Sequence, residues 1–210
     1  MARNSSASPP GGSPRFVLVA ALAAGLLILA VGVLFAIMTR EGSRGAGGTA
    51  LGSAIGGPFR LTDQNGKTVT EKSLKGRPTL IFFGYTHCPD VCPTSLFEMS
   101  EVLRAMGKDA DKVNAVFISV DPERDTPATM KDYLSSFDPH LEGLSGDPAE
   151  TTKVLTSYRV YAKKVPTKDG DYTMDHTALI YLMDRDGRFV APFNLKRTPE
   201  EAAVELKRYL

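Results

Sequence analysis

Cysteine and histidine are scarce in this sequence. Its 210 residues contain two cysteines and three histidines. A four-cysteine zinc site is not supported, because a second cysteine pair is missing. The net charge of +1 gives no indication of nucleic-acid binding or of acidic partners. The thiol chemistry of the chain is therefore confined to one place.

The two cysteines, Cys88 and Cys92, lie four positions apart in the segment GYTHCPDVCPT, residues 84–94. Four residues make about one turn of a helix, so both sulfurs can point the same way. They can then reach one ion or each other. The spacing allows a metal site, a redox dithiol, or both.

The N-terminal part differs in composition from the rest. Residues 1–14 are rich in serine, proline and glycine and are predicted to be disordered. Residues 16–38 carry no charge, and as a helix they would rise about 34 Å, enough to cross a hydrocarbon core of about 30 Å. We expect a transmembrane anchor over 15–39 rather than a cleaved signal peptide, whose apolar core is about 7–15 residues long. A glycine-rich tether then covers 40–57.

Residues 58–210 are predicted to form one globular domain. Apolar runs of strand length alternate with segments that have helical spacing or begin at a capping residue. The expected strands are a hairpin at 59–70, buried strands at 78–84 and 113–120, and a pair at 177–183 and 189–193. The expected helices cover 93–106, begin near 126 and 147, and run from 198 to the end. This order predicts an α/β fold, with a mixed central sheet flanked by helices and an N-terminal β-hairpin.

The dithiol lies where the strand at 78–84 leads into the helix expected from Pro93. Unpaired N–H groups at a helix N-terminus lower the pKa of a nearby thiol, which favours both metal binding and thiol exchange. Thioredoxin-like oxidoreductases have two residues between their cysteines, whereas this chain has three. Attachment of c-type haem needs a histidine where Pro93 stands. A soft metal held by two thiolates and one imidazole, such as copper, fits the available ligands better.

His176 is the candidate third ligand. It precedes the strand at 177–183, where thioredoxin-type enzymes place a cis-proline against their dithiol and this chain has none. His87 adjoins Cys88, but neighbouring residues of an extended segment point apart. His140 follows a proline in a loop and is expected to be solvated.

Three further features have ordinary structural interpretations. A single methionine near a candidate ligand is usually a packing residue, so Met174 is assigned to the core. Asp90, between the cysteines, is assigned to a turn. The acidic segment 121–125 is interpreted as a solvated loop before a helix.

Four segments together resemble the Sco/SenC family of copper chaperones for cytochrome c oxidase assembly. They are GYTHCPDVCPTSL, SVDPERDTP, SYRVYAKK and DHTALIYLMDRDGRF, in that order behind one apolar span. The resemblance covers essentially residues 54–210. It implies a thioredoxin-like fold, one copper ion as Cu(I) or Cu(II), and copper ligands at Cys88, Cys92 and His176.

The resemblance also implies the partner and the compartment. Copper would pass to the CuA centre in subunit II of the oxidase, which makes the chain a carrier and not an enzyme. The CuA domain faces the periplasm or the mitochondrial intermembrane space. The hydrophilic N-terminus favours a bacterial inner membrane with the domain in the periplasm, where other copper carriers or thiol reductants are further partners.

Two other activities use the same cysteines. A membrane-tethered thiol–disulfide reductase would need the dithiol but not His176. A peroxidase is suggested by VCPT, residues 91–94, but peroxiredoxins keep a threonine or serine three residues before the reactive cysteine. Here those positions hold Pro89 and Tyr85, so the activating hydroxyl is missing.

Overall fold

The structure, a computed structural model, describes Gly25 and residues 55–210. The domain that contains the dithiol corresponds to the unit Ala54–Leu210. The expected disordered start at 1–14, the anchor at 15–39 apart from Gly25, and residues 40–54 of the tether lie outside the described residues. Among the described residues, none belongs to a helix with the length and apolar character needed to cross a membrane.

A mixed sheet of seven strands forms the centre of the domain, in the order β2-β1-β5-β4-β3-β8-β9. The three middle strands β5, β4 and β3 are parallel to one another, and every other pair of neighbouring strands in the sheet is antiparallel. The strands are β1 Arg60–Asp63, β2 Thr68–Thr70, β3 Thr79–Gly84, β4 Asn114–Ser119, β5 Leu141–Ser145, β8 Ile180–Met183 and β9 Phe189–Pro192.

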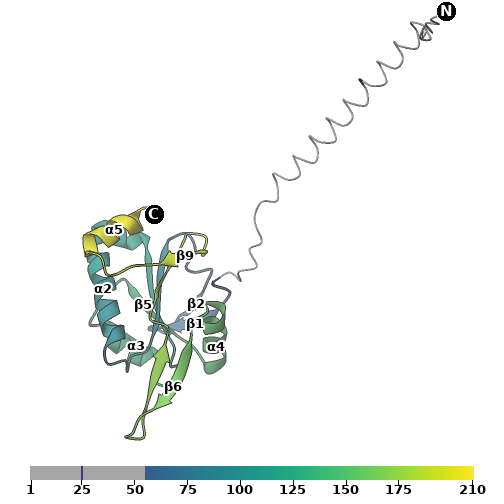
Figure 1. Cartoon of the computed structure of the whole chain (residues 1–210), viewed down its shortest axis with the longest axis vertical. Coiled ribbons are helices and arrows are strands. Elements are labelled where there is room, and N and C mark those ends of the chain that lie inside the picture. Colours follow the sequence, from purple (N-terminus) through teal and green to yellow (C-terminus); the bar gives the residue numbers. More distant parts are fainter. Residues whose placement is uncertain (1–24, 26–54) are drawn as a thin grey trace, which may run out of the picture. The chain divides into compact units, whose positions relative to one another are not determined.

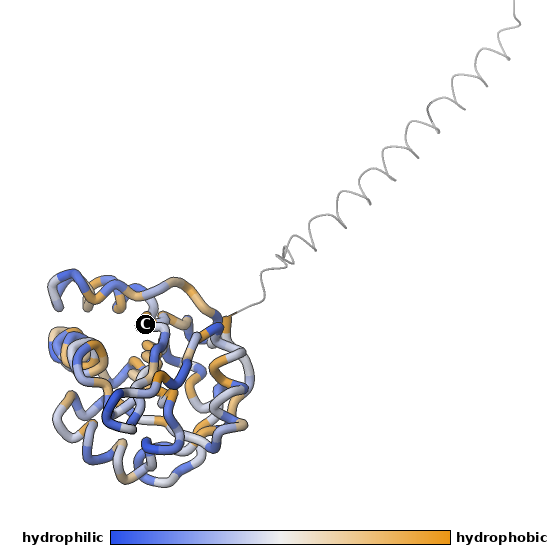
Figure 2. Tube along the Cα trace, turned by 60° about the horizontal axis from the view of Figure 1, so that its bottom comes forward, coloured by the Kyte–Doolittle hydropathy of each residue, from blue (hydrophilic) through white to orange (hydrophobic). Residues whose placement is uncertain are grey.

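Helices cover both faces of this sheet (Figure 1). They are α2 Val91–Met106, α3 Pro127–Leu134, α4 Pro148–Ser157 and α5 Pro199–Lys207, with a 3-10 helix at Gly107–Lys112. Helices α2, α3 and α5 lie on one side of the sheet and α4 on the other. Along the helices the trace changes repeatedly between hydrophobic and hydrophilic residues, as amphipathic helices on a core require (Figure 2).

Strand β3 is the most enclosed part of the sheet, because every one of its residues is buried. A strand that is covered on both faces, as β3 is here between β4 and β8, is typically continuously apolar. Phe82 stacks on Phe117 of β4, with ring centroids 5.8 Å apart. On the opposite face, Phe83 packs against Tyr158 and Tyr181 at 5.4 and 5.5 Å. The strand that leads to the dithiol is thus held from both sides.

A second, two-stranded sheet consists of β6, Ala162–Pro166, and β7, Tyr172–His176. It projects from the domain as a hairpin (Figure 1). The sequence did not predict this hairpin, because its strands are largely polar and β6 is mostly exposed, so the alternation that marks a half-buried strand is missing.

The predicted helix starts are confirmed at three places. The side chains of Thr126, Asp147 and Thr198 accept hydrogen bonds from the backbone N–H groups three residues later. A proline follows each cap at the first helical position, where its missing N–H needs no partner. At Thr198 the full capping box forms with Glu201.

Other boundaries differ from the prediction. Helix α2 begins at Val91, so Pro93 lies inside its first turn, where proline is tolerated. Residues 177–179 are outside β8, and His176 is the last residue of β7 instead of a loop residue. Strand β5 was not predicted, because it is short and contains Gly143. The glycine is required by packing, since a Cβ added there would lie 2.6 Å from Leu134 Cδ1 of α3.

Gly84 ends β3 at the point where the chain turns toward the dithiol. A Cβ at this position would lie 2.7 Å from Phe117 Cε2 and 2.8 Å from Cys92 Sγ. We predict that Gly84→Ala lowers the free energy of unfolding by about 1–3 kcal/mol, because neither neighbour can move freely in a packed core. Urea unfolding checks this. Val204→Ala, which trims an exposed side chain on α5, is the control and should change the value by less than about 0.5 kcal/mol. Equal values for the two variants would contradict the prediction.

Candidate metal centre

The two cysteines lie where β3 meets α2. Cys88 is in the loop after β3, and Cys92 is in the first turn of the helix. Both are free thiols and buried, Cys92 completely and Cys88 at 8 % exposure. The backbone N–H of Cys92 donates to Cys88 Sγ at 3.3 Å. Cys88 therefore uses one of the N–H groups that a helix start leaves unpaired.

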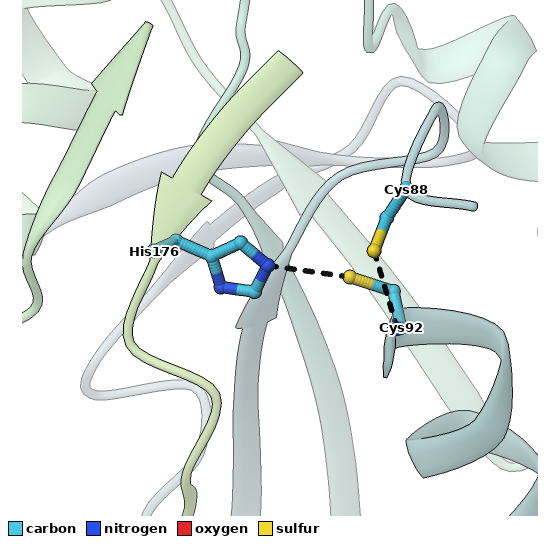
Figure 3. A group of neighbouring side chains, drawn as sticks. All are labelled: Cys88, Cys92 and His176. Atoms are coloured by element: carbon cyan, nitrogen blue, oxygen red, sulfur yellow. Dashed lines mark hydrogen bonds between the residues drawn. The ribbon is translucent and has the colours of Figure 1, made fainter. Parts of the chain in front are cut away.

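His176 lies at the base of the hairpin, opposite Ala162, and faces the two sulfurs (Figure 3). Its Nε2 lies 3.5 Å from Cys92 Sγ. Its Nδ1 lies 3.1 Å from the carbonyl oxygen of Thr177. A carbonyl can only accept, so Nδ1 carries a hydrogen, and in the neutral imidazole Nε2 is left with its lone pair toward the sulfurs. This is the second partner that metal-binding histidines usually have.

The three donor atoms form one cluster. Both Sγ atoms and the imidazole nitrogen lie within 4.8 Å of one another, and this is the metal-capable group found in the described part of the chain. Two sulfurs and one imidazole make a soft donor set, which suits copper or zinc better than magnesium or calcium. With three donors and without a fourth, a closed tetrahedral zinc site is not formed by this group.

The thiols differ strongly in acidity. The hydrogen bond from the Cys92 thiol is the largest influence on Cys88, and with those from His176 and the backbone it lowers the pKa of Cys88 to about 4 despite burial. The same interaction with Cys88, together with burial, raises the pKa of Cys92. Burial works against a charged His176, but hydrogen bonds to Cys88 and to Thr177 outweigh it and raise its pKa. The first proton is thus lost from Cys88.

Aromatic rings enclose the imidazole. The ring of Tyr85 stands edge-on to that of His176 at 5.7 Å, and Phe82 approaches it at 6.4 Å. The Tyr85 hydroxyl is 2.6 Å from Thr173 Oγ1 on the same strand as His176. These contacts fix the side of the imidazole that faces the domain.

The interpretation of 121–125 as a solvated loop was wrong. The side chains of Asp121 and Asp125 are fully buried. Asp125 accepts hydrogen bonds from Ser119 Oγ and Thr86 Oγ1, both at 2.6 Å, and from the Thr86 backbone. Burial raises its pKa against these hydrogen bonds. Three acids within five residues indicate a hydrophilic loop, and only the quoted SVDPERDTP pattern marked the segment as unusual.

Of the remaining candidates, His87 and Met174 are as predicted, whereas His140 is less solvated than expected. His87 is exposed and is not part of the cluster, as expected. His140 is half-buried and lies at the surface between Asp138 and Asp111, at 2.7 and 3.1 Å, so its pKa is raised by these ion pairs. Met174 belongs to the core cluster, which confirms its packing role.

Comparisons with known proteins agree on one family. The SCO1/SenC family model matches residues 47–210. The structure of Bradyrhizobium japonicum ScoI with copper bound is 92% identical, covers 75% of this chain and 100% of its own, and has a TM-score of 0.74. BsSco, described as having a disulfide switch and as a member of the Sco family of cytochrome c oxidase assembly proteins, is 26% identical with a TM-score of 0.59; the match covers 75% of this chain and 94% of BsSco.

A curated relative is the Arabidopsis thaliana "Protein SCO1 homolog 1, mitochondrial", which is 46% identical over 139 residues. That match covers 66% of this chain but only 42% of the plant protein. The chain belongs to the SCO1/SenC family. The expected mixed α/β, thioredoxin-like fold of its described domain is confirmed by these structures.

The unequal acidity predicts selective alkylation of the reduced protein. Cys88 should react with iodoacetamide at a rate that changes little between about pH 5 and about pH 8, because its thiolate is already formed there. Cys92 should stay unmodified. Peptide mapping by mass spectrometry after timed quenching measures both sites.

Cys92→Ala is the matched control for this measurement. It removes the thiol that donates to Cys88, so the pKa of Cys88 should rise and its reaction should become slow at low pH. Equal labelling of both cysteines in the unmodified sequence would show that the proton is not held on Cys92.

Proposed function

We propose that this chain is a metallochaperone that holds one copper ion with Cys88, Cys92 and His176. It delivers this cargo to the CuA centre of cytochrome c oxidase subunit II. The observation that carries the proposal is the cluster of two sulfurs and one imidazole nitrogen within 4.8 Å. Copper in the homologous ScoI structure and the oxidase-assembly role of the family support it.

The donor set suits a carrier. Two thiolates and one imidazole satisfy copper without closing its coordination sphere, so ligands from a partner can enter. Cys88 provides the first thiolate, and the Nδ1–H bond to the Thr177 carbonyl keeps Nε2 available as the third donor. Copper would leave by exchange of these ligands for those of the partner. The cargo is released unchanged, so we assign no catalytic residue and no enzymatic activity.

The same dithiol allows redox control of loading. Joining the sulfurs of Cys88 and Cys92 in a disulfide releases two electrons and two protons to an oxidant, and it removes both thiolate donors together. A thiol reductant returns the electrons and protons and restores the site. We propose that the empty carrier is kept competent by such a reductant.

The proposal includes a location. The apolar segment 15–39 would anchor the chain in a bacterial inner membrane, and the tether at 40–57 would let the domain at 58–210 reach a membrane-bound oxidase from the periplasm. Tethering raises the effective concentration of the partner. The relatives include mitochondrial proteins, for which the intermembrane space is the equivalent compartment.

A thiol–disulfide reductase acting on the CuA-site cysteines is the second candidate. The asymmetric pair favours it, because an acidic, slightly exposed Cys88 can attack a disulfide and a buried Cys92 can then resolve the mixed disulfide. This activity needs His176 only indirectly. The two candidates therefore differ in their dependence on the imidazole.

Copper binding by the soluble domain tests the chaperone. We predict one copper ion per domain, no stable copper after purification of Cys88→Ser or Cys92→Ser, and at least about tenfold weaker Cu(II) binding in His176→Ala, because one of three donors is removed. Competition titration with a chelator of known affinity measures each value. His87→Ala is the matched control and should bind like the unmodified protein.

Transfer to a purified CuA domain separates the two candidates. With reduced CuA cysteines, copper should move from the loaded domain, and His176→Ala should transfer poorly. With oxidised CuA cysteines, a reductase should reduce them equally well in His176→Ala. Full copper binding in the cysteine variants would refute the chaperone function, and disulfide reduction without any copper transfer would favour the reductase.

A further inference from the structure

His176 is carried by a hairpin that belongs to a separate sheet. Strands β6 and β7 pair with each other, and neither is part of the seven-stranded sheet. At the base of the hairpin, the Thr177 N–H donates to the Tyr161 carbonyl at 3.0 Å. Apart from these contacts at its base, the hairpin is positioned by side-chain contacts with the domain.

Arg124 makes several of these contacts. Its guanidinium carbon lies 3.7 Å from the centre of the Tyr172 ring, and Nη1 donates to the Tyr172 carbonyl at 3.0 Å. Nη1 also lies 3.3 Å from a carboxylate oxygen of Asp171. Tyr172 is the first residue of β7, and His176 is the last. Arg124 thus holds both the ring and the backbone at one end of the strand that carries the imidazole.

A buried carboxylate fixes Arg124 in turn. Asp121 accepts from Arg124 Nε at 2.5 Å through one oxygen, and from the Tyr172 hydroxyl at 2.9 Å through the other. The backbone N–H of Asp121 is bound by Ser119 Oγ at 2.9 Å. A planar guanidinium that pairs with a carboxylate and stacks on an aromatic ring is a geometry that lysine cannot reproduce.

The same loop also holds the cysteine segment. Asp125, one residue after Arg124, accepts hydrogen bonds from the backbone and hydroxyl of Thr86, two residues before Cys88. The loop 121–125 therefore binds the cysteine-bearing and the histidine-bearing segments at once. Glu123 adds an ion pair with Lys164 of β6 at 2.5 Å.

Burial separates this arrangement from a docking surface. The side chain of Arg124 is 16% exposed, and that of Asp121 is fully buried. A partner protein could not reach the ion pair without opening the hairpin. The charges of Arg124 and Asp121 therefore serve to hold the hairpin against the domain.

We infer that Arg124 is a positioning residue for the metal centre, which keeps Nε2 of His176 within reach of the sulfurs by clamping Tyr172 at the start of β7. Arg124 approaches the cysteine segment at the Tyr85 ring, 5.7 Å from its guanidinium carbon, but Cys88 and Cys92 are held mainly by β3, α2 and Asp125. Loss of Arg124 should then impair what depends on the imidazole and spare what depends only on the dithiol. The copper readout of this inference rests on the proposed function.

A comparison of Arg124→Met, Arg124→Lys and Arg188→Met tests the inference in the soluble domain. Arg188 is an exposed arginine with ion pairs inside its own turn, and its substitution is the matched control. Arg124→Met should weaken Cu(II) binding about 10–100-fold, as loss of a supporting residue does at other metal sites. The reduction potential of the dithiol, which does not involve the imidazole directly, should be unchanged, and Arg124→Lys should restore only part of the loss. A changed reduction potential of the dithiol in Arg124→Met would overturn the inference.

A double-mutant cycle shows whether Arg124 acts through His176. In a His176→Ala background, Arg124→Met should have no further effect on Cu(II) binding, because the imidazole that it positions is gone. Additive losses would overturn the inference. Should Arg124→Met fail to fold, Tyr172→Leu removes the other half of the stacked pair and should give the same pattern.

Hydrogen exchange of the metal-free domain provides a test that needs no copper. Arg124→Met should speed exchange of the β6–β7 amides and leave those of β3 and β4 unchanged, whereas His176→Ala should alter the hairpin less. Unchanged hairpin exchange would overturn the role of Arg124 and leave the proposed copper function standing. A different outcome is that Arg124→Met and His176→Ala both bind Cu(II) normally while hairpin exchange becomes faster in Arg124→Met. This result would refute the proposed function but support the role of Arg124 in holding the hairpin.

Discussion

The candidate site depends on bringing together two segments that are 84 residues apart in sequence, those of Cys92 and His176. Fixing that contact has an entropic cost that the few atoms of the cluster cannot offset by themselves. Strand β3, buried on both faces, fixes one side, and the loop 121–125 joins it to the other. The three donors lie close together because the apolar core positions the cysteine segment and the polar network of the loop positions the histidine strand beside it.

The buried acids show how such a network is tolerated. Placing a carboxylate in the interior is unfavourable unless charge and hydrogen bonds compensate for lost water. Asp121 has a guanidinium and a phenol as partners, and Asp125 has two hydroxyls and a backbone N–H. Satisfied in this way, both acids become rigid connectors near the dithiol. Removing one partner alone would leave a buried charge without compensation.

Much of the domain could be predicted from sequence because its signals are local. The apolar run of β3 and the caps at Thr126 and Thr198 depend on a few neighbouring residues, so they can be recognised from the sequence alone. Strand β5 and the β6–β7 hairpin could not be found in this way. These strands are short or polar, and they form because they pair with strands elsewhere in the chain.

The same distinction holds for the candidate site. The cysteine spacing and the position of His176 indicated three donors. The Thr177 carbonyl that sets the imidazole tautomer is an interaction in space, and so is the clamp on Tyr172. The acidic loop looked solvated because hydrophilic residues usually are. Burial of a charge is decided by the partners that the fold provides, and local composition does not record them.

The hairpin also divides the site into parts of unequal stability. Local opening in proteins follows cooperative units, and a two-stranded hairpin outside the main sheet can open with far less free energy than a central parallel strand. The two sulfurs would remain in place during such an opening, while the Arg124–Tyr172 contact near the tip is lost and His176 is held from the base of the hairpin alone. The lifetime of a bound ion would then depend on contacts of β6 and β7 that lie away from the metal, and a partner that binds these strands could shorten it without touching the ion.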